Sequence, residues 1–331
     1  MEKKDVQNII TIGASAGGFS AVSSLLSTLP ADLDAAVFVV IHLSKTSRED
    51  MVLNLLNKKS VLEVRIPENG ASIENGIVYL APVNEHMIIE KGLITISGGA
   101  KENHWRPAID VLFRTAAAAY DSCVTGIILT GLLDDGTSGM VAIKAAGGVC
   151  IVQEPDEAEF PDMPNNVINN IEVDYRVPLL DIAYILNDIY SRGDCDPSAI
   201  PENIKQESEI TIRMASSYEA TSKLGKPTVY TCPDCGGVLT EIEEAGMLRY
   251  RCFTGHVFTE NVLLKEFSEK TEESLWVAIR MMEERRNFML SMAERLGETQ
   301  EVKEERINRA SLLKDNIDNL KHILQALNKT D

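Results

Sequence analysis

The chain has 331 residues, of which 44% are hydrophobic and 25% charged, a composition typical of a folded protein with about two domains. Its 50 acidic residues outnumber its 32 basic ones and give a formal net charge of −18, which argues against binding to nucleic acid or to anionic lipid. The longest apolar run, residues 35–41, is far shorter than the roughly 18 residues that a membrane-spanning helix needs. We therefore expect a cytoplasmic protein with no nucleic-acid partner and no membrane insertion.

Residues 1–193 alternate strand-like and helix-like segments, which predicts an α/β domain with a doubly wound, mainly parallel sheet. Residues 87–97 interrupt this series with the pattern of a β-hairpin. Short apolar runs bounded by turn residues predict buried strands at 9–13, 36–42, 77–81, 125–130 and 148–153.

The remainder of the chain divides into three segments. Residues 194–226 have no clear periodicity and predict a linker. Residues 227–260 form a compact cysteine-containing module, and residues 261–331 carry two heptad-like patterns separated by Gly297. These patterns predict a helical hairpin or coiled coil, through which the protein could form a homodimer.

A glycine-rich loop, Gly13-Ala14-Ser15-Ala16-Gly17-Gly18, follows the first predicted strand and leads into a helix. It could be a simple strand-to-helix turn or a phosphate-binding loop, although Ser15 replaces the second glycine of the dinucleotide pattern and no Walker lysine follows. It also fits a G-x-S-x-G turn, which exposes a serine nucleophile above a sheet. The loop alone does not decide between these three hypotheses.

A serine nucleophile needs a base and a group that orients the base. His42 ends the second predicted strand, and Asp135 follows the strand at residues 125–130 just before a predicted helix. A histidine ending an apolar strand can be structural, and an acid before a helix is commonly a cap. However, the carboxyl ends of parallel strands are where open α/β sheets place their active sites. The three residues together therefore favour a catalytic triad.

These residues belong to a series of motifs that resembles the catalytic domain of the chemotaxis protein-glutamate methylesterases, the CheB family. The resemblance covers about residues 5–190 and is carried, in family order, by residues 13–18, the strand ending in His42, 79–87, 106–113 and 130–140. It implies a serine hydrolase that cleaves γ-methyl esters of glutamate on chemoreceptors and, in some members, deamidates glutamine. By position it implies Ser15 as nucleophile, His42 as general base and acid, and Asp135 as the orienting carboxylate, with no cofactor needed for catalysis.

The chain departs from the family pattern in two ways. Leu133-Asp134 stands where relatives usually have Gly-Asn, so Asp134 could compete with Asp135 for His42. About eight residues precede the first strand, so we expect a form without the phosphorylatable receiver domain. We also expect backbone amides near Ala16 or Leu132 to stabilise an oxyanion. Arg106 could hold substrate carboxylates, but the favoured role is pairing with Asp110 one helical turn later.

The cysteine module has the spacing of a zinc ribbon. Cys232 and Cys235 form a C-x-x-C pair, Cys252 follows after 16 residues, and His256 completes a C-x-x-x-H pair. This pattern predicts a Cys₃His site for a structural zinc ion, with a β-hairpin at 238–251 between the two pairs. A redox pair is less consistent with the sequence, because no thioredoxin-like β-α context surrounds it. Cys123, Cys150 and Cys195 are expected to take no part.

The leading hypothesis is therefore a CheB-like methylesterase whose partner is a methylated chemoreceptor or a similar signalling protein. Two alternatives remain open from the residues: a non-catalytic scaffold that binds receptors through the same cleft, and an esterase for a different carboxyl methyl ester. A nucleotide-binding protein is the least favoured.

Overall fold

The computed structural model describes residues 6–44, 46–191, 195, 197–213, 217–295 and 299–327. The chain divides into two units, Met1–Val262 and Leu263–Asp331. Each unit is described by itself.

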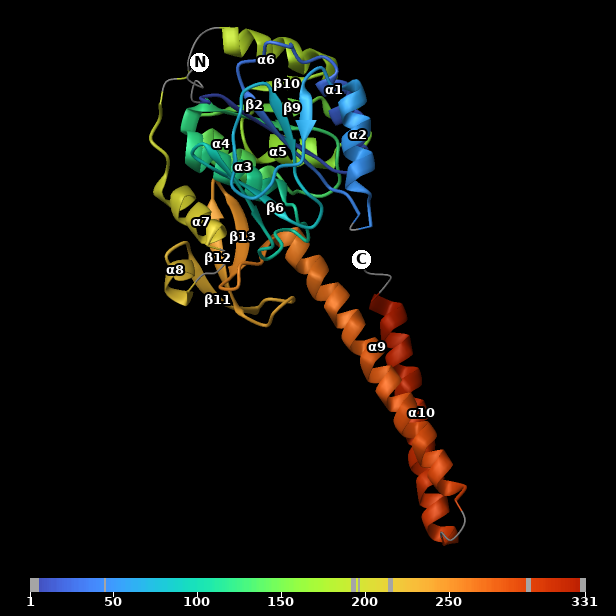
Figure 1. Ribbon diagram of the computed structural model, residues 1–331. Coiled ribbons are helices and arrows are strands. Elements are labelled where there is room, and N and C mark those ends of the chain that lie inside the picture. Colours follow the sequence, from blue (N-terminus) through green and yellow to red (C-terminus); the bar gives the residue numbers. More distant parts are fainter. Residues whose placement is uncertain are drawn as a thin grey trace. The chain divides into compact units, whose positions relative to one another are not determined.

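A seven-stranded parallel sheet forms the centre of the first unit, as Figure 1 shows. Its strand order is β10-β9-β8-β1-β2-β5-β3, so β1 lies between β8 and β2 at the point where the chain changes direction across the sheet. The strands are β1 (Ile9–Ala14), β2 (Ala36–Ile41), β3 (Glu63–Arg65), β5 (Ile77–Leu80), β8 (Val124–Ile128), β9 (Val149–Gln153) and β10 (Tyr175–Val177). The prediction of a mainly parallel sheet is confirmed.

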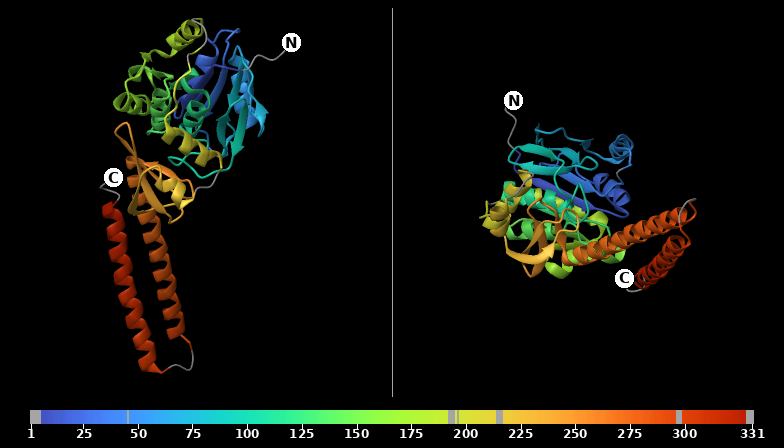
Figure 2. Two further views of the ribbon diagram at one scale, coloured as in Figure 1. Left: turned by 90° about the vertical axis from the view of Figure 1, so that its left-hand side faces the viewer. Right: turned by 90° about the horizontal axis from the view of Figure 1, so that it is seen from below.

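Helices cover both faces of this sheet (Figures 1 and 2). One face packs its apolar side chains against α1 (Gly18–Leu26), α2 (Glu49–Lys59) and α6 (Ile182–Ser191). The other packs against α3 (Ile109–Tyr120), α4 (Thr137–Ala145) and α5 (Asp162–Asn170). The central strands β1 and β2 are buried along their whole length, because both of their faces are covered. Short 3₁₀ turns are η1 (Asp121–Cys123), η2 (Pro155–Glu157) and η3 (Leu179–Asp181).

A small antiparallel sheet is built on a hairpin that occupies the chain between β5 and α3. The predicted hairpin is present as β6 (His86–Glu90) and β7 (Leu93–Ser97), and β4 (Ala71–Ser72) adds to its edge. Met87 and Ile89 of β6 are buried in the same apolar cluster as α3. This insertion therefore extends the core on the α3 side of the sheet.

The cysteine module is a second, four-stranded antiparallel sheet of order β11-β12-β13-β14. Its strands are β11 (Lys226–Thr231), β12 (Val238–Glu244), β13 (Met247–Cys252) and β14 (Val257–Thr259). The hairpin expected at 238–251 is present, with Leu239 opposite Cys252 and Glu244 opposite Met247.

The segment 194–226, which the sequence predicts as a linker, contains two helices, α7 (Glu202–Ile212) and α8 (Tyr218–Ser222). Helix α7 buries Ile204 in the main apolar core and Glu207 among charged partners. Its buried face is small and partly polar, which explains why hydrophobic periodicity did not reveal it. Cys195, at the start of this segment, forms a disulfide with Cys123, a pairing that the sequence analysis did not anticipate.

Charged side chains buried between α3, α7 and β13 join the module to the sheet domain. Arg114 pairs with Glu102 at 2.5 Å and Glu207 at 3.4 Å, and Arg249 pairs with Glu207 at 2.8 Å. Arg251 contacts Glu102 at 3.3 Å and Glu207 at 3.2 Å. We call this the ion cluster, and its members are Glu102, Arg114, Glu207, Glu244, Arg249 and Arg251. Three guanidinium groups meet three carboxylates, so removing one carboxylate leaves a buried charge without its partner.

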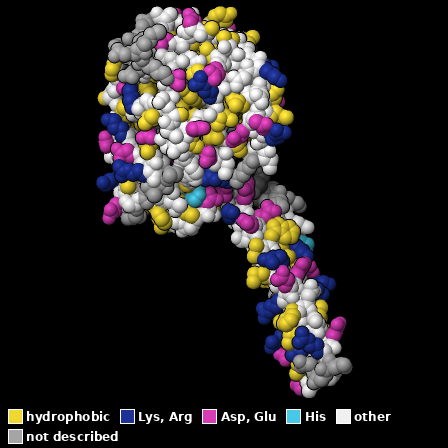
Figure 3. Space-filling view, viewed as in Figure 1, with side chains coloured by type: hydrophobic (Ala, Val, Ile, Leu, Met, Phe, Trp, Pro, Cys, Tyr) yellow, Lys and Arg dark blue, Asp and Glu magenta, His cyan; other side chains and the backbone are white. Residues whose placement is uncertain are grey.

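The second unit consists of the rest of α9 (Glu260–Ala293) together with α10 (Gln300–Leu327), which lie side by side (Figure 2). Buried Ile279, Ile317 and Leu324 form the contact between them. Apolar side chains also alternate with charged ones on the outer surface of the pair (Figure 3), where Met281 and Phe288 are each 60% exposed. The homodimer through these helices stays a prediction. Within the described residues, no helix combines the length and apolarity needed to cross a bilayer.

We predict that Glu207→Gln lowers the free energy of unfolding by about 3–5 kcal/mol, because three buried guanidinium groups then face only two carboxylates, Glu102 and Glu244. The matched control is Glu209→Gln in the same helix. Glu209 pairs with Arg213 where both side chains are more than 60% exposed, so its loss changes stability by only about 0–1 kcal/mol. Urea denaturation of both variants measures the difference, and equal effects would contradict the role given to the ion cluster.

Candidate active site and metal centre

Ser15 lies in the turn between β1 and α1, at the carboxyl end of the sheet. Its backbone N–H donates to the Thr130 carbonyl at 3.0 Å, and its own carbonyl accepts from the Gly18 N–H at 2.8 Å. Gly17 has a left-handed φ of 72°, and a Cβ there would lie 2.7 Å from the Glu159 carboxylate. The turn therefore requires glycine at this position, both for its conformation and for its close neighbour.

His42 follows β2 and stands between Ser15 and Asp135. Its Nδ1 lies 3.1 Å from Ser15 Oγ, and its Nε2 lies 2.9 Å from Asp135 Oδ2. The indole of Trp105 stacks on the imidazole, with ring centroids 3.9 Å apart and planes inclined by 6°. The His42 side chain is only 1% exposed. With a proton on Nε2 donated to Asp135, the Nδ1 lone pair faces the serine hydroxyl.

Asp135 is held by the start of a helix that is distant in sequence. Its Oδ2 accepts from the Ile109 N–H at 2.7 Å and its Oδ1 from the Asp110 N–H at 3.2 Å, which are the first two residues of α3. Helix starts leave such N–H groups unpaired and favour negative charge beside them. The carboxylate is thereby fixed on the side of His42 that is opposite Ser15.

Asp110 returns the same interaction to the helix that follows Asp135. Its Oδ1 accepts from the N–H groups of Gly136 at 2.9 Å and Gly139 at 2.7 Å, at the start of α4. Its Oδ2 accepts from the side-chain amide of Asn103 at 2.9 Å. The predicted pairing of Arg106 with Asp110 is therefore wrong. Arg106 instead donates to the carbonyls of Gly98 and Gly99, because Asp110 points inward, where it caps α4.

Burial sets the protonation of these groups. Loss of solvation lowers the pKa of His42 from 6.5 to about 3, which leaves the imidazole neutral and able to accept a proton. Burial raises the pKa of Asp135, while hydrogen bonds from the Ile109 and Asp110 amides act in the opposite direction. Burial also raises the pKa of Asp110, and the nearby charge of Asp135 adds to this effect.

Asp134 does not compete for His42, contrary to the possibility raised from the sequence. Its Oδ2 accepts a hydrogen bond from the Thr259 hydroxyl of β14, and burial raises its pKa. The Leu133-Asp134 pair thus places a buried carboxyl group against the cysteine module, where it bonds to Thr259 and not to the imidazole. The sequence could not predict this contact, because 125 residues separate the two partners.

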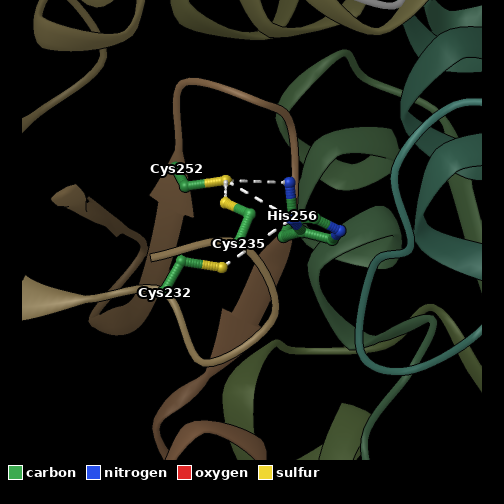
Figure 4. Close-up of side chains that lie close together, drawn as sticks. All are labelled: Cys232, Cys235, Cys252 and His256. Atoms are coloured by element: carbon green, nitrogen blue, oxygen red, sulfur yellow. Dashed lines mark hydrogen bonds between the residues drawn. The ribbon is translucent and has the colours of Figure 1, made fainter. Parts of the chain in front are cut away.

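The predicted metal ligands come together as Figure 4 shows. One donor atom from each of Cys232, Cys235, Cys252 and His256 lies within 4.8 Å of all the others. Cys235 Sγ and Cys252 Sγ are 3.7 Å apart, and His256 Nδ1 is 3.7 Å from Cys232 Sγ and 3.6 Å from Cys252 Sγ. Ligands about 2.3 Å from a tetrahedral zinc ion are separated by about 3.8 Å. The donor set therefore fits zinc.

The surroundings of these four residues also suit a metal ion. Asp234 Oδ2 lies 3.7 Å from His256 Nε2, the ring nitrogen that points away from the sulfur atoms. A carboxylate in this position orients a ligating histidine and raises its basicity. The free thiol Cys150 is buried in β9, and Cys123 and Cys195 are bonded to each other, so these three cysteines lie outside the site.

Two residues of the site were missed in the sequence. Trp105 packs on the imidazole, and Asn103 bonds to Asp110; both belong to the loop before α3. This loop has no periodicity, and the functional role of its side chains depends on contacts with distant segments. A tryptophan and an asparagine directly before the motif at 106–113 were the available indication.

The fold and the hydrogen-bonded Ser15, His42 and Asp135 define a doubly wound α/β domain with a serine-histidine-aspartate arrangement at the point where the strand order reverses. Residues 10–186 match the family described as CheB methylesterase. The chain belongs to this family.

Relatives and solved structures agree with this membership. A protein of Leptospira interrogans is 39% identical over 175 residues, which are 53% of this chain and 90% of that protein. A Methanosarcina acetivorans protein named protein-glutamate methylesterase/protein-glutamine glutaminase 2 is 36% identical over 187 residues, 54% of this chain and 52% of its own. The chain thus spans about half the length of that relative. The CheB methylesterase catalytic domain of Thermotoga maritima superposes with a TM-score of 0.53 at 30% identity, over 55% of this chain and 98% of that one.

We predict that Trp105→Ala raises the pKa of His42 toward its ordinary value of 6.5, because burial is what lowers it. In the wild type the imidazole stays neutral as the pH falls below 6.5, where the unfolded chain binds a proton. The free energy of unfolding therefore decreases with falling pH in this range. NMR titration of the imidazole measures the pKa, with Trp276→Ala in α9 as the control. An unchanged pKa in Trp105→Ala would contradict the role given to Trp105 in burying the imidazole.

Proposed function

We propose that this protein is a protein-glutamate methylesterase that uses Ser15 as nucleophile, His42 as general base and acid, and Asp135 as the orienting carboxylate. The observation that carries the proposal is the continuous hydrogen-bonded series from Ser15 Oγ through the imidazole to Asp135. Membership in the CheB methylesterase family supports the reaction class.

In the first half-reaction, His42 Nδ1 takes the proton of the Ser15 hydroxyl as Oγ attacks the ester carbonyl carbon. Asp135 keeps the Nε2–H in place and stabilises the imidazolium that forms. The negative charge on the carbonyl oxygen is stabilised by backbone N–H groups, for which the amides of Ala16 and Leu132 beside the nucleophile are our candidates. His42 then returns the proton to the leaving methoxy group, and methanol departs.

In the second half-reaction, His42 Nδ1 accepts a proton from water, whose oxygen attacks the acyl carbon. The bond to Ser15 Oγ breaks, the serine recovers its proton, and the glutamate carboxylate is released. A glutamine side chain follows the same steps with ammonia as the leaving group. The relatives' names include protein-glutamine glutaminase, which supports this second activity.

We infer that the substrate is a methylated chemoreceptor or a similar signalling protein in the cytoplasm. The names of the relatives specify glutamate and glutamine within a protein as the reacting groups. Ser15 and the exposed Leu132 and Leu133 lie at the same end of the sheet, where a polypeptide side chain could approach the nucleophile.

We also propose that residues 227–260 form a zinc ribbon in which Cys232, Cys235, Cys252 and His256 hold one ion. Zinc bound by four protein ligands has no open position for substrate and supplies structural cross-linking. The module buries few apolar side chains of its own, which supports a structural role for the metal.

Methanol release from carboxyl-methylated receptor cytoplasmic fragments tests the function. We expect turnover by the wild type and a loss of about 10⁴-fold or more in Ser15→Ala, because the acyl-enzyme can no longer form. The control is Ser20→Ala, an exposed serine in the neighbouring helix α1, which should keep wild-type turnover. Equal turnover by Ser15→Ala would exclude this nucleophile. Absence of turnover in the folded wild type would favour a scaffold or a different ester.

Metal analysis tests the zinc ribbon. We expect about one zinc ion per chain in the purified protein and a large loss of zinc in Cys252→Ser, which removes one of the four ligands. Cys150→Ser is the matched control, since this cysteine is a buried free thiol of β9 outside the site. A wild-type protein that binds no zinc, or equal zinc content in both variants, would contradict the assignment.

A further inference from the structure

Two of the proposed metal ligands, Cys252 and His256, each have a sequence neighbour that contacts the same short turn of the catalytic domain, residues 102–105. Arg251, directly before Cys252, pairs with Glu102 at 3.3 Å. Val257, directly after His256, accepts a hydrogen bond at its carbonyl from the Asn103 N–H at 2.8 Å. A metal ion that fixes Cys252 and His256 therefore also fixes both residues that hold this turn.

The turn itself has a conformation that its surroundings must maintain. Glu102 and Trp105 close it with two backbone hydrogen bonds of 3.3 and 2.9 Å. Between them, Asn103 and His104 both have left-handed backbones, with φ values of 49° and 70°. Two residues other than glycine rarely adopt this backbone conformation one after the other, and it persists only where neighbouring contacts impose it. Trp105, at the end of the turn, is the residue that stacks on His42.

Asn103 connects the turn to both the module and the triad. Its backbone N–H donates to Val257, and its side-chain oxygen accepts from the Thr259 N–H at 3.1 Å. Its side-chain nitrogen donates to Asp110, which caps α4 beside Asp135. The residue is only 2% exposed. The oxygen and the nitrogen of this side chain thus connect β14 to the start of α3.

A second contact joins β14 to the segment that carries Asp135. The Thr259 hydroxyl donates to Asp134, the residue directly before Asp135. Strand β14 therefore touches the segments that carry two of the side chains in contact with His42: the stacking ring of Trp105 and the orienting carboxylate of Asp135. The module contacts His42 itself at neither point, so its influence must pass through these neighbours.

We propose that metal binding by the Cys₃His site positions His42 for catalysis through β14, with Asn103 as the positioning residue that carries the effect. The inference rests on the function and the zinc site proposed above. With the metal bound, β14 holds the 102–105 turn and Trp105 against the imidazole. Without it, Cys252 and His256 are free to separate, the turn relaxes, and the imidazole loses its fixed orientation toward Ser15. Misplacement of a catalytic group by about 1 Å costs about 100-fold in rate.

The first experiment follows Trp105 directly. The chain has two tryptophans, so Trp276→Phe leaves Trp105 as the only fluorescent indole. Zinc is removed from this full-length variant with a chelator and then restored, while zinc content, Trp105 emission, acrylamide quenching and the rate of methanol release are measured. We expect removal to increase quenching of Trp105 and to lower kcat about 10- to 100-fold with little change in KM. Restoring zinc should reverse both effects, and the recovery of Trp105 quenching and of kcat should follow the measured zinc content together. Loss of zinc with unchanged Trp105 quenching would overturn the proposal.

The second experiment keeps the metal and removes the link. Asn103→Gly preserves the left-handed backbone but deletes the side chain. We expect it to bind about one zinc ion, as the wild type does, and to show the increased quenching and reduced kcat of the zinc-free protein. Ala245→Gly is the matched control, since Ala245 also has a left-handed φ, of 50°, but lies in the β12–β13 turn. Wild-type quenching in zinc-loaded Asn103→Gly would overturn the proposal, even if chelation unfolds the module.

The two readouts separate the failure of this inference from the failure of the proposed function. If the zinc-loaded wild type releases no methanol, the esterase assignment fails, and the Trp105 measurements still decide whether the metal site controls the turn. If turnover is normal but independent of zinc and of Asn103, the esterase stands and the coupling is wrong.

Discussion

Two carboxylates, each bound by the start of the other's helix, hold the candidate active site together. Asp135 precedes α4 but accepts hydrogen bonds from the first amides of α3, whereas Asp110 of α3 accepts hydrogen bonds from amides at the start of α4. Each carboxylate accepts hydrogen bonds from N–H groups that a helix start leaves unpaired, and the dipole of that helix stabilises its negative charge. The side chain of buried Asp135 is thereby held by α3, and the backbone that follows it is held by Asp110. The orientation of His42, and hence its approach to Ser15, depends on that position.

The remaining parts of the site follow from the parallel sheet. Ser15 and Asp135 follow adjacent strands, β1 and β8, and His42 follows β2 on the other side of β1. The carboxyl ends of these strands meet at one edge, so three short loops suffice to bring the groups together. The loop before α3 does not take its position from a strand of the parallel sheet. It is held instead by contacts with β14 of the module and by Glu102 in the ion cluster.

Much of this could be predicted from the sequence, and the exceptions share a cause. The strands, the hairpin at 87–97 and helix α3 have strong hydrophobic periodicity, and the residues proposed as the triad lie where strands end. Trp105, Asn103 and the contact of Asp134 with Thr259 depend on segments far apart in the chain. Helix α7 was interpreted as a linker because much of its buried surface is charged, and a glutamate such as Glu207 normally indicates exposure.

The ion cluster makes the boundary of the recognised family differ from the boundary of the folded unit. The match to the family ends at residue 186, yet Arg114 and Glu102, inside the match, complete their charge balance with Glu207 and Arg251 beyond it. A fragment that ended at residue 186 would lack Glu207 and Arg251, and it would expose Arg114 and Glu102, which are buried in the whole chain. Likewise, the cysteine module could not be transplanted onto another catalytic domain unless that domain also carried the matching arginine and glutamate. The two parts form a single physical unit, and exchanging one requires exchanging its counter-charges.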